Sequence, residues 1–115
     1  MPTAYVVDDH AAFREAASAL LSSVGFEVVG TANDGPEALR ELSARPVDLA
    51  LVDLYLPGPD GVDVTSEIVA MGGARAVVIV SSREDAGTER RVRSALAEFI
   101  PKRDLTPARL RGLLP

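Results

Sequence analysis

Residues 49–53 read Leu49-Ala50-Leu51-Val52-Asp53, a run of apolar residues that ends in a carboxylate. Such a run is typical of a strand that is buried on both faces, as strands are in parallel sheets. Residues 4–7 form a second apolar run, which is followed by Asp8 and Asp9. Open α/β sheets bind their ligands at the carboxyl ends of the strands. The sequence therefore predicts that two strands bring three carboxylates to one crevice.

Strand and helix patterns alternate along the whole chain. Helices are indicated by apolar residues at spacings of three and four, and their ends by capping residues and glycines. The predicted strands cover residues 4–7, 26–30, 48–53, 76–80 and 98–101. The predicted helices cover about residues 13–24, 35–44, 61–71, 85–96 and 107–114.

The later helices have apolar faces that should be buried against the sheet. The helix over 85–96 is the weakest prediction because its apolar face is thin. In the last helix Thr106 is the expected cap and Pro107 the first residue. The residues expected to face inward are Val64, Ile68 and Met71 in the third helix, Val92, Ala95 and Leu96 in the fourth, and Leu110, Leu113 and Leu114 in the last.

Five such units predict a doubly wound α/β fold with a five-stranded parallel sheet, because right-handed crossovers place helices on both of its faces. Pro101 cannot donate to a sheet ladder, so the last strand should lie at an edge. The order 2-1-3-4-5 satisfies this condition and places the first and third strands side by side. We therefore expect a flavodoxin-like fold and, at 115 residues, one domain spanning 1–115.

The composition excludes several classes of protein. There is no cysteine, which rules out disulfides and thiolate metal sites. No apolar run approaches the roughly 18 residues of a membrane helix. A net charge of −5 lacks the basic footprint of a nucleic-acid binder. We expect a cytoplasmic protein that binds neither membrane nor nucleic acid directly.

Charge is distributed unevenly along the chain. Residues 1–80 carry 4 basic and 12 acidic side chains, whereas residues 81–115 carry 8 basic and 5 acidic ones. A basic carboxyl-terminal part is compatible with a partner-binding face there. Solvated helix surfaces are the simpler explanation of the same pattern.

The predicted carboxylate cluster needs something that relieves its repulsion. Two unit charges about 4 Å apart repel by roughly 4 kcal/mol at an effective dielectric near 20. Either a proton or a bound cation can remove this cost, and oxygen ligands on a wet rim suit Mg²⁺. The alternative for one of Asp8 and Asp9 is that it only caps the first helix.

Two further strand ends supply the hydroxyl and the ammonium group that a phosphoryl-transfer site needs beside its carboxylates. Ser81 and Ser82 follow the fourth strand, and Lys102 follows the fifth. A hydroxyl and an ammonium group can stabilise the oxygens of a phosphoryl group in transfer. Asp53 would then be the nucleophile and form an acyl phosphate. Taken singly, Ser81 would more often be a turn residue and Lys102 a surface charge.

Four segments of the chain form a specific combination: Val6–His10, Leu51–Pro57 with Asp60-Gly61, Val78–Ser82 and Phe99–Lys102. Together they make the sequence resemble, over its whole length, the receiver domains of two-component response regulators. The histidine after the acidic pair and the lysine without a following proline are most similar to receivers of the LuxR-type, NarL-like subfamily.

The resemblance implies a phosphoacceptor and its cofactor. Asp53 would take phosphate from a histidine kinase, and Asp9 and Asp53 would bind Mg²⁺ together with the backbone carbonyl of Tyr55. Asp8 would act through a water molecule, and Lys102 would contact the phosphoryl oxygens. The chain would thus be a regulatory domain that assists its own phosphorylation and dephosphorylation, not a conventional enzyme.

The resemblance also implies a switch. Ser81 would be the switch hydroxyl, preferred over Ser82 because it directly follows the strand, and Phe99 would be the coupled aromatic residue. Their movement would change the face formed by the fourth helix, the fifth strand and the fifth helix. The partners would be the kinase and either a downstream protein or an output domain in the same chain. A chain from Met1 to Pro115 without a linker favours a stand-alone protein, and phosphorylation could produce a homodimer.

Three residues near the predicted site have alternative interpretations. His10 could be a metal ligand or a phosphodonor, but a solvent-facing loop residue is the simpler expectation because Mg²⁺ prefers oxygen. Tyr55 and Arg83 occupy flanking loop positions where members of the family tune the lifetime of the phosphate. Arg83 could equally be an ordinary surface charge.

The switch region departs from the pattern of the family. The segment between Ser81 and Phe99 is about one residue short, and Ala95 and Glu98 replace the usual glycines. Arg103 stands where many receivers have a proline after a cis bond. The main alternative is therefore an interaction module that no longer uses phosphate. A phosphatase would need an aspartate where Tyr55 stands, and an electron carrier would need a phosphate loop after the first strand.

Overall fold

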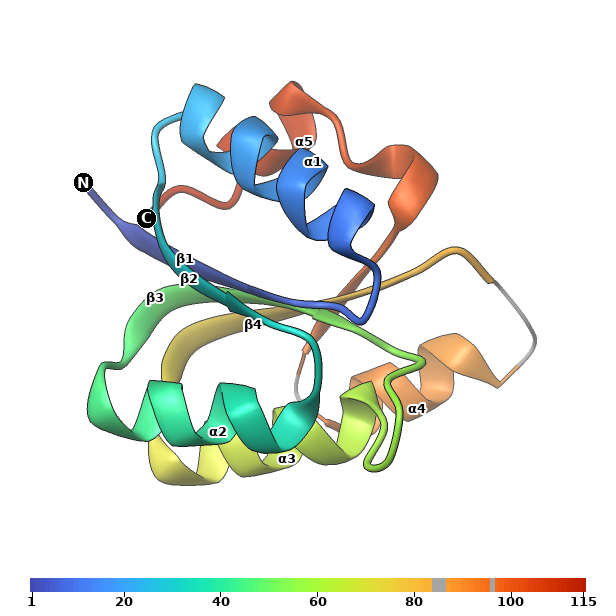
Figure 1. Ribbon diagram of the computed structural model, residues 1–115. Coiled ribbons are helices and arrows are strands. Elements are labelled where there is room, and N and C mark those ends of the chain that lie inside the picture. The colour runs from blue at the N-terminus through green and yellow to red at the C-terminus, as the bar shows by residue number, and fades with distance from the viewer. Residues whose placement is uncertain (84–86, 96) are drawn as a thin grey trace.

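A parallel sheet with helices on both faces organises the computed structural model, which describes residues 1–83, 87–95 and 97–115 (Figure 1). The strands are β1 (Thr3–Val7), β2 (Glu27–Ala32), β3 (Val47–Asp53), β4 (Ala74–Ser81) and β5 (Glu98–Pro101). The helices are α1 (Ala11–Ser23), α2 (Gly35–Ala44), α3 (Gly61–Met71), α4 (Thr88–Ser94) and α5 (Pro107–Arg111), with a 3-10 turn at Lys102–Asp104.

The sheet order is β2-β1-β3-β4-β5 and every pairing is parallel, which confirms the predicted doubly wound, flavodoxin-like fold. β5 lies at an edge, as Pro101 requires. Helices α1 and α5 cover one face of the sheet, and α2, α3 and α4 cover the other (Figure 1).

Side-chain alternation along β3 builds a core on each face. Leu49 and Leu51 join an apolar cluster with α1 and α5, whereas Ala50 and Val52 join one with α2 and α3. A third, smaller cluster contains Leu54, Ile79 and Val92, with Phe99 packed against it, and it holds α4. Because both faces are covered, the strands read as continuous apolar runs.

Helix ends follow the expected local chemistry. The Asp34 side chain caps α2 by accepting from the backbone N–H of Glu37, at 2.9 Å. Thr106 caps α5 by accepting from Arg109 N, with Pro107 as the first helical residue. Gly25 follows α1 with a φ of +115°, a conformation that favours glycine and ends the helix.

Strand β2 is longer than predicted and runs to Ala32 instead of residue 30. Gly30 looked like the end of the strand, but it pairs with Tyr5 inside the ladder. A Cβ at position 30 would lie 2.8 Å from Cε2 of the Tyr5 ring, so glycine is required there by packing. β4 also exceeds the predicted 76–80, beginning at Ala74 and including Ser81.

The helical predictions need three corrections. Met71 is 40% exposed although it has the helical spacing of Val64 and Ile68, because it is the last residue of α3, which ends at Gly72. α5 ends at Arg111, although Leu113 and Leu114 still pack against the α1/α5 cluster. α4 covers Thr88–Ser94, with Val92 buried as expected and Ala95 buried just beyond it. Residues 85, 86 and 96 of the predicted helix lie outside the described residues.

Within the described residues there is no cis peptide bond. The chain therefore leaves β5 through the turn Lys102–Asp104 with a trans bond at Arg103. No helix in the described part of the chain has the length and apolar character to cross a bilayer.

Candidate functional site at the carboxyl ends of the strands

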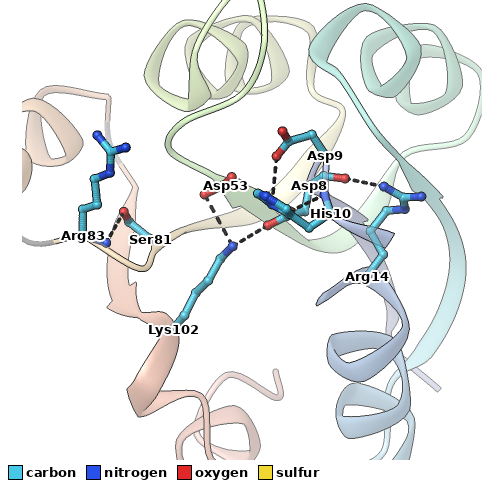
Figure 2. Close-up of polar contacts among 8 residues, drawn as sticks. All are labelled: Asp8, Asp9, His10, Arg14, Asp53, Ser81, Arg83 and Lys102. Carbon is cyan, nitrogen blue, oxygen red and sulfur yellow. Dashed lines mark hydrogen bonds and ion pairs between the residues drawn. The ribbon is translucent and has the colours of Figure 1, made fainter. Parts of the chain in front are cut away.

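Strand register explains why the predicted site residues meet. Val7 pairs with Val52, so Asp8 and Asp53 follow on neighbouring strands at the same level. Asp53 in turn pairs with Val80, which precedes Ser81. Ser81 pairs with Pro101, the residue before Lys102. The carboxyl ends of β1, β3, β4 and β5 thus bring polar side chains together at one end of the sheet, as Figure 2 shows.

The acidic cluster is compact and largely buried. Asp8 and Asp53 are 0% and 4% exposed, whereas Asp9 is on the surface. One ligand atom from each of Asp8, Asp9, His10 and Asp53 lies within 4.8 Å of the others. Three carboxylates at this separation, open to solvent on one side, form a set of oxygen donors that fits Mg²⁺.

Lys102 supplies the positive charge at the centre of the site. Its Nζ lies 2.8 Å from Asp8 Oδ2, at hydrogen-bond distance, and 3.8 Å from Asp53 Oδ1 (Figure 2). Its side chain is 17% exposed. The lysine therefore pairs first with Asp8 and faces Asp53 as a second, longer ion pair.

The surroundings of Asp53 raise the pKa of its carboxyl group above the ordinary value. Burial raises the pKa of Asp53, and the charge of Asp8 raises that pKa further. Lys102 offsets part of the rise, while Asp9 adds to it. The ionised carboxylate is therefore costly in the absence of a cation.

His10 lies over the acidic pair and not away from it. Its ring Nδ1 is 3.2 Å from Oδ1 of both Asp8 and Asp9, although the side chain is 71% exposed. His10 is also the N-cap residue of α1, and its backbone N–H donates to Asp8 Oδ1 at 2.8 Å. Asp8 thus closes a local turn, and neither aspartate occupies the cap position that the simple alternative assigned to one of them.

Ser81 and Ser82 differ clearly in environment. Ser81 is fully buried at the end of β4, and its Oγ accepts a hydrogen bond from Arg83 N at 2.9 Å. Ser82 is exposed. Figure 2 shows Ser81 on the β4 side of Asp53, with its hydroxyl turned toward the loop.

The loop after Asp53 closes tightly against the strand end. Gly61 N donates to Leu54 O at 2.8 Å, and a Cβ at Gly61 would lie only 2.3 Å from Asp53 O. Glycine is therefore needed where α3 begins beside the site. Across the opening, the Arg83 guanidinium lies 4.9 Å from the centroid of the Tyr55 ring, so the two flanking residues contact each other.

Phe99 lies on β5, and strand β4 separates it from Asp53 at the end of β3. It pairs with Ile79 in the ladder, is half-buried and packs against the cluster that holds α4. Val92, Arg93, Ala97 and Phe99 line a depression of about 220 Å³ between α4 and β5.

Two residues near the site were not recognised from the sequence. Arg14 Nη1 donates to the backbone O of Asp8 at 2.8 Å, and the Phe13 ring contacts the ammonium of Lys102. Phe13 is the first residue of the predicted helix over about 13–24, a pattern that indicates burial against the sheet and not a contact with the site. The available signal was their place in the first turn of a helix that starts directly after Asp8 and Asp9.

The family model described as the response regulator receiver domain matches residues 4–113. The chain belongs to the response regulator receiver domain family. This receiver domain is 33% identical over 107 residues to the transcriptional regulatory protein PdtaR of Mycobacterium tuberculosis, covering 90% of this chain and 52% of that protein. It thus spans about half the length of that curated relative.

Two solved structures support the assignment to LuxR-type, NarL-like receivers. The receiver domain of the putative response regulator NarL from Mycobacterium tuberculosis has a TM-score of 0.81 and 32% identity, covering 96% of this chain and 90% of that one. A LuxR-family response regulator from Aurantimonas has a TM-score of 0.85 and 30% identity, covering 96% of this chain and 79% of that one. The resemblance found in the sequence is therefore confirmed.

Proposed function

We propose that this receiver domain is a phosphoacceptor that takes a phosphoryl group from a histidine kinase onto Asp53. One observation carries the proposal: Asp53, Asp8 and Asp9 converge with Lys102 at a single edge of the sheet. A cluster of three acids, two of them buried, has no structural benefit of its own, whereas it suits a cation and a phosphoryl group.

In the proposed reaction, a carboxylate oxygen of Asp53 attacks phosphorus. The bond from phosphorus to the kinase histidine nitrogen breaks, and its electron pair stays on that nitrogen. The product is an acyl phosphate, which water later hydrolyses to the carboxylate and inorganic phosphate. Lys102 Nζ, 3.8 Å from Asp53 Oδ1, is placed to donate to an oxygen of the transferred group.

We propose that Asp9, Asp53 and the backbone carbonyl of Tyr55 hold Mg²⁺, with Asp8 acting through a water molecule. The ion supplies charge neutralisation for the phosphoryl oxygens. Asp8 is already bound by Lys102 at 2.8 Å, which agrees with an indirect role for this carboxylate.

The proposed switch uses Ser81 and Phe99. The Ser81 hydroxyl would leave Arg83 N and donate to the phosphoryl group, which would pull the end of β4 toward Asp53. Phe99 is half-buried next to the depression at α4, so its ring has room to turn inward. The face of α4, β5 and α5 would change for a downstream protein or an output domain in the same chain.

The alternative is an interaction module that binds its partner without phosphate. It is favoured only by the atypical sequence between Ser81 and Phe99. An intact set of acids with a paired lysine argues for phosphate chemistry.

The test is incubation of the protein with Mg²⁺ and acetyl phosphate, followed by intact-mass measurement. We expect one phosphoryl group per chain, no adduct in Asp53→Asn, and a normal adduct in the matched variant Asp63→Asn, whose residue is exposed on α3. A wild-type protein that takes no phosphate would support the interaction module instead.

A further inference from the structure

The Phe13 ring lies against the cation of the site. Lys102 Nζ is 4.1 Å from the centroid of this ring, well within the distance of about 6 Å at which a cation is attracted to an aromatic face. The same ammonium is 2.8 Å from Asp8 Oδ2 and 3.8 Å from Asp53 Oδ1. The cation is therefore bounded by two carboxylates and one ring.

The ring is held in place by the core. Phe13 is half-buried in the first turn of α1 and packs against the α1/α5 cluster. Ala17 and Leu21, one and two turns further along the same helix face, are buried in that cluster. The ring therefore forms a fixed surface, whereas Lys102 reaches it from the turn after β5 on a flexible four-carbon chain.

An aromatic ring suits this position for an electrostatic reason. A fourth carboxylate would hold the lysine but would also repel a phosphoryl group and raise the proton affinity of Asp53 further. An aliphatic side chain would fill the space without attracting the ammonium. The ring attracts the cation and adds no net charge to a site that already has three acids.

We infer that Phe13 is a positioning residue, whose ring holds Lys102 Nζ between Asp8 and Asp53. The consequence for phosphoryl transfer rests on the function proposed above. The placement of Lys102 by the ring does not depend on that function, because it is a property of the unphosphorylated protein.

Two variants separate the ring from its packing. Phe13→Leu keeps an apolar side chain of similar reach but removes the ring, and Phe13→Tyr keeps the ring. Leu20→Ala is the matched control, because Leu20 packs against the same cluster from the same helix, two turns beyond Phe13. Unfolding curves establish that each variant is folded at the assay temperature.

The first measurement is the NMR shift of the Lys102 side-chain methylene protons next to Nζ. In the wild type the ring current should move them upfield. The shift should vanish in Phe13→Leu and remain in Phe13→Tyr and Leu20→Ala. Unshifted methylene protons in the folded wild type would overturn the inference.

The second measurement is the rate of phosphorylation by acetyl phosphate with Mg²⁺. Phe13→Leu should be slower by about threefold to tenfold, as expected for loss of one cation–ring contact, and Phe13→Tyr and Leu20→Ala should stay within about twofold of wild type. A folded Phe13→Leu that reacts as fast as wild type would overturn the role in transfer. If the wild type takes no phosphate, the proposed function fails, while the NMR shift still decides whether the ring holds the lysine.

Discussion

At the scale of the residue, the site is defined by the cost of ionising Asp53. Burial raises its pKa above the ordinary value of 3.8, and Asp8 adds to the rise. The folded protein therefore retains this proton at pH values where the unfolded chain has released it. Stability contributed by Asp53 is highest below pH 3.8 and falls as the pH rises through the folded pKa.

Removing this charge should stabilise the fold when no divalent cation is present. With a chelator at pH 7, Asp53→Asn should unfold a few degrees higher than the wild type. The difference should shrink as the pH falls through the raised pKa of Asp53, because the folded protein then carries this carboxyl as the neutral acid. Thermal unfolding followed by circular dichroism from pH 4 to pH 8 measures it. A variant no more stable than wild type at any of these pH values would refute the account of this charge.

At the scale of the element, α4 is attached to the site by two contacts of different kinds. Val92 packs with Leu54 and Ile79, and Arg91 forms an ion pair with Asp60 Oδ2. Oδ1 of Asp60 meanwhile caps α3 by accepting from the N–H groups of Val62 and Asp63. One side chain thus joins the start of α3, directly after the Asp53 loop, to α4.

The ion pair can be tested separately from the cap. Burial alone would raise the pKa of Asp60, but hydrogen bonds from Asp63 N and Arg91 outweigh it and lower that pKa. The pair therefore stabilises the fold above pH 3.8 and is lost as the pH falls through the lowered value. Arg91→Gln should cost about 0.2–1 kcal/mol at pH 7, since Arg91 is largely exposed.

Asp60→Ala should cost more than Arg91→Gln, because it removes the cap as well, worth about 1 kcal/mol. Urea unfolding measures both values, and amide exchange should quicken in α4 but not in α3 for Arg91→Gln. Equal losses of unfolding free energy in the two variants would contradict the separate contribution of the cap.

Strands and helices could be predicted from the sequence where a local pattern of residues is sufficient to define them. The apolar runs ending in Asp8 and Asp53, and the proline in the last strand, were sufficient for the sheet order and for the convergence of the acids. The end of β2 was missed because Gly30 is required by the ring of Tyr5, a packing relation across strands. The contacts of Phe13 and Arg14 depend in the same way on how α1 sits beside the turn after β5.

At the scale of the whole molecule, the proposed signal must pass from the acids on β1 and β3 to the edge of the sheet formed by β5. The face of α4, β5 and α5 carries both charge signs: the last turns of α4 and α5 are basic, and Glu98 is acidic. If phosphorylation favours a homodimer through this face, light scattering should show the mass rising from one chain to two with Mg²⁺ and acetyl phosphate. Added salt should weaken the dimer. One chain in both states would exclude it.

The most direct test of the central claim is chemical mapping of the phosphorylated residue. An acyl phosphate is reduced by borohydride, which converts its aspartate to homoserine, and peptide sequencing by mass spectrometry locates the change. After treatment with Mg²⁺ and acetyl phosphate, homoserine should appear at position 53 alone, and only when donor and Mg²⁺ are both present. Phosphate found on His10, or no reduction product at position 53, would contradict the account.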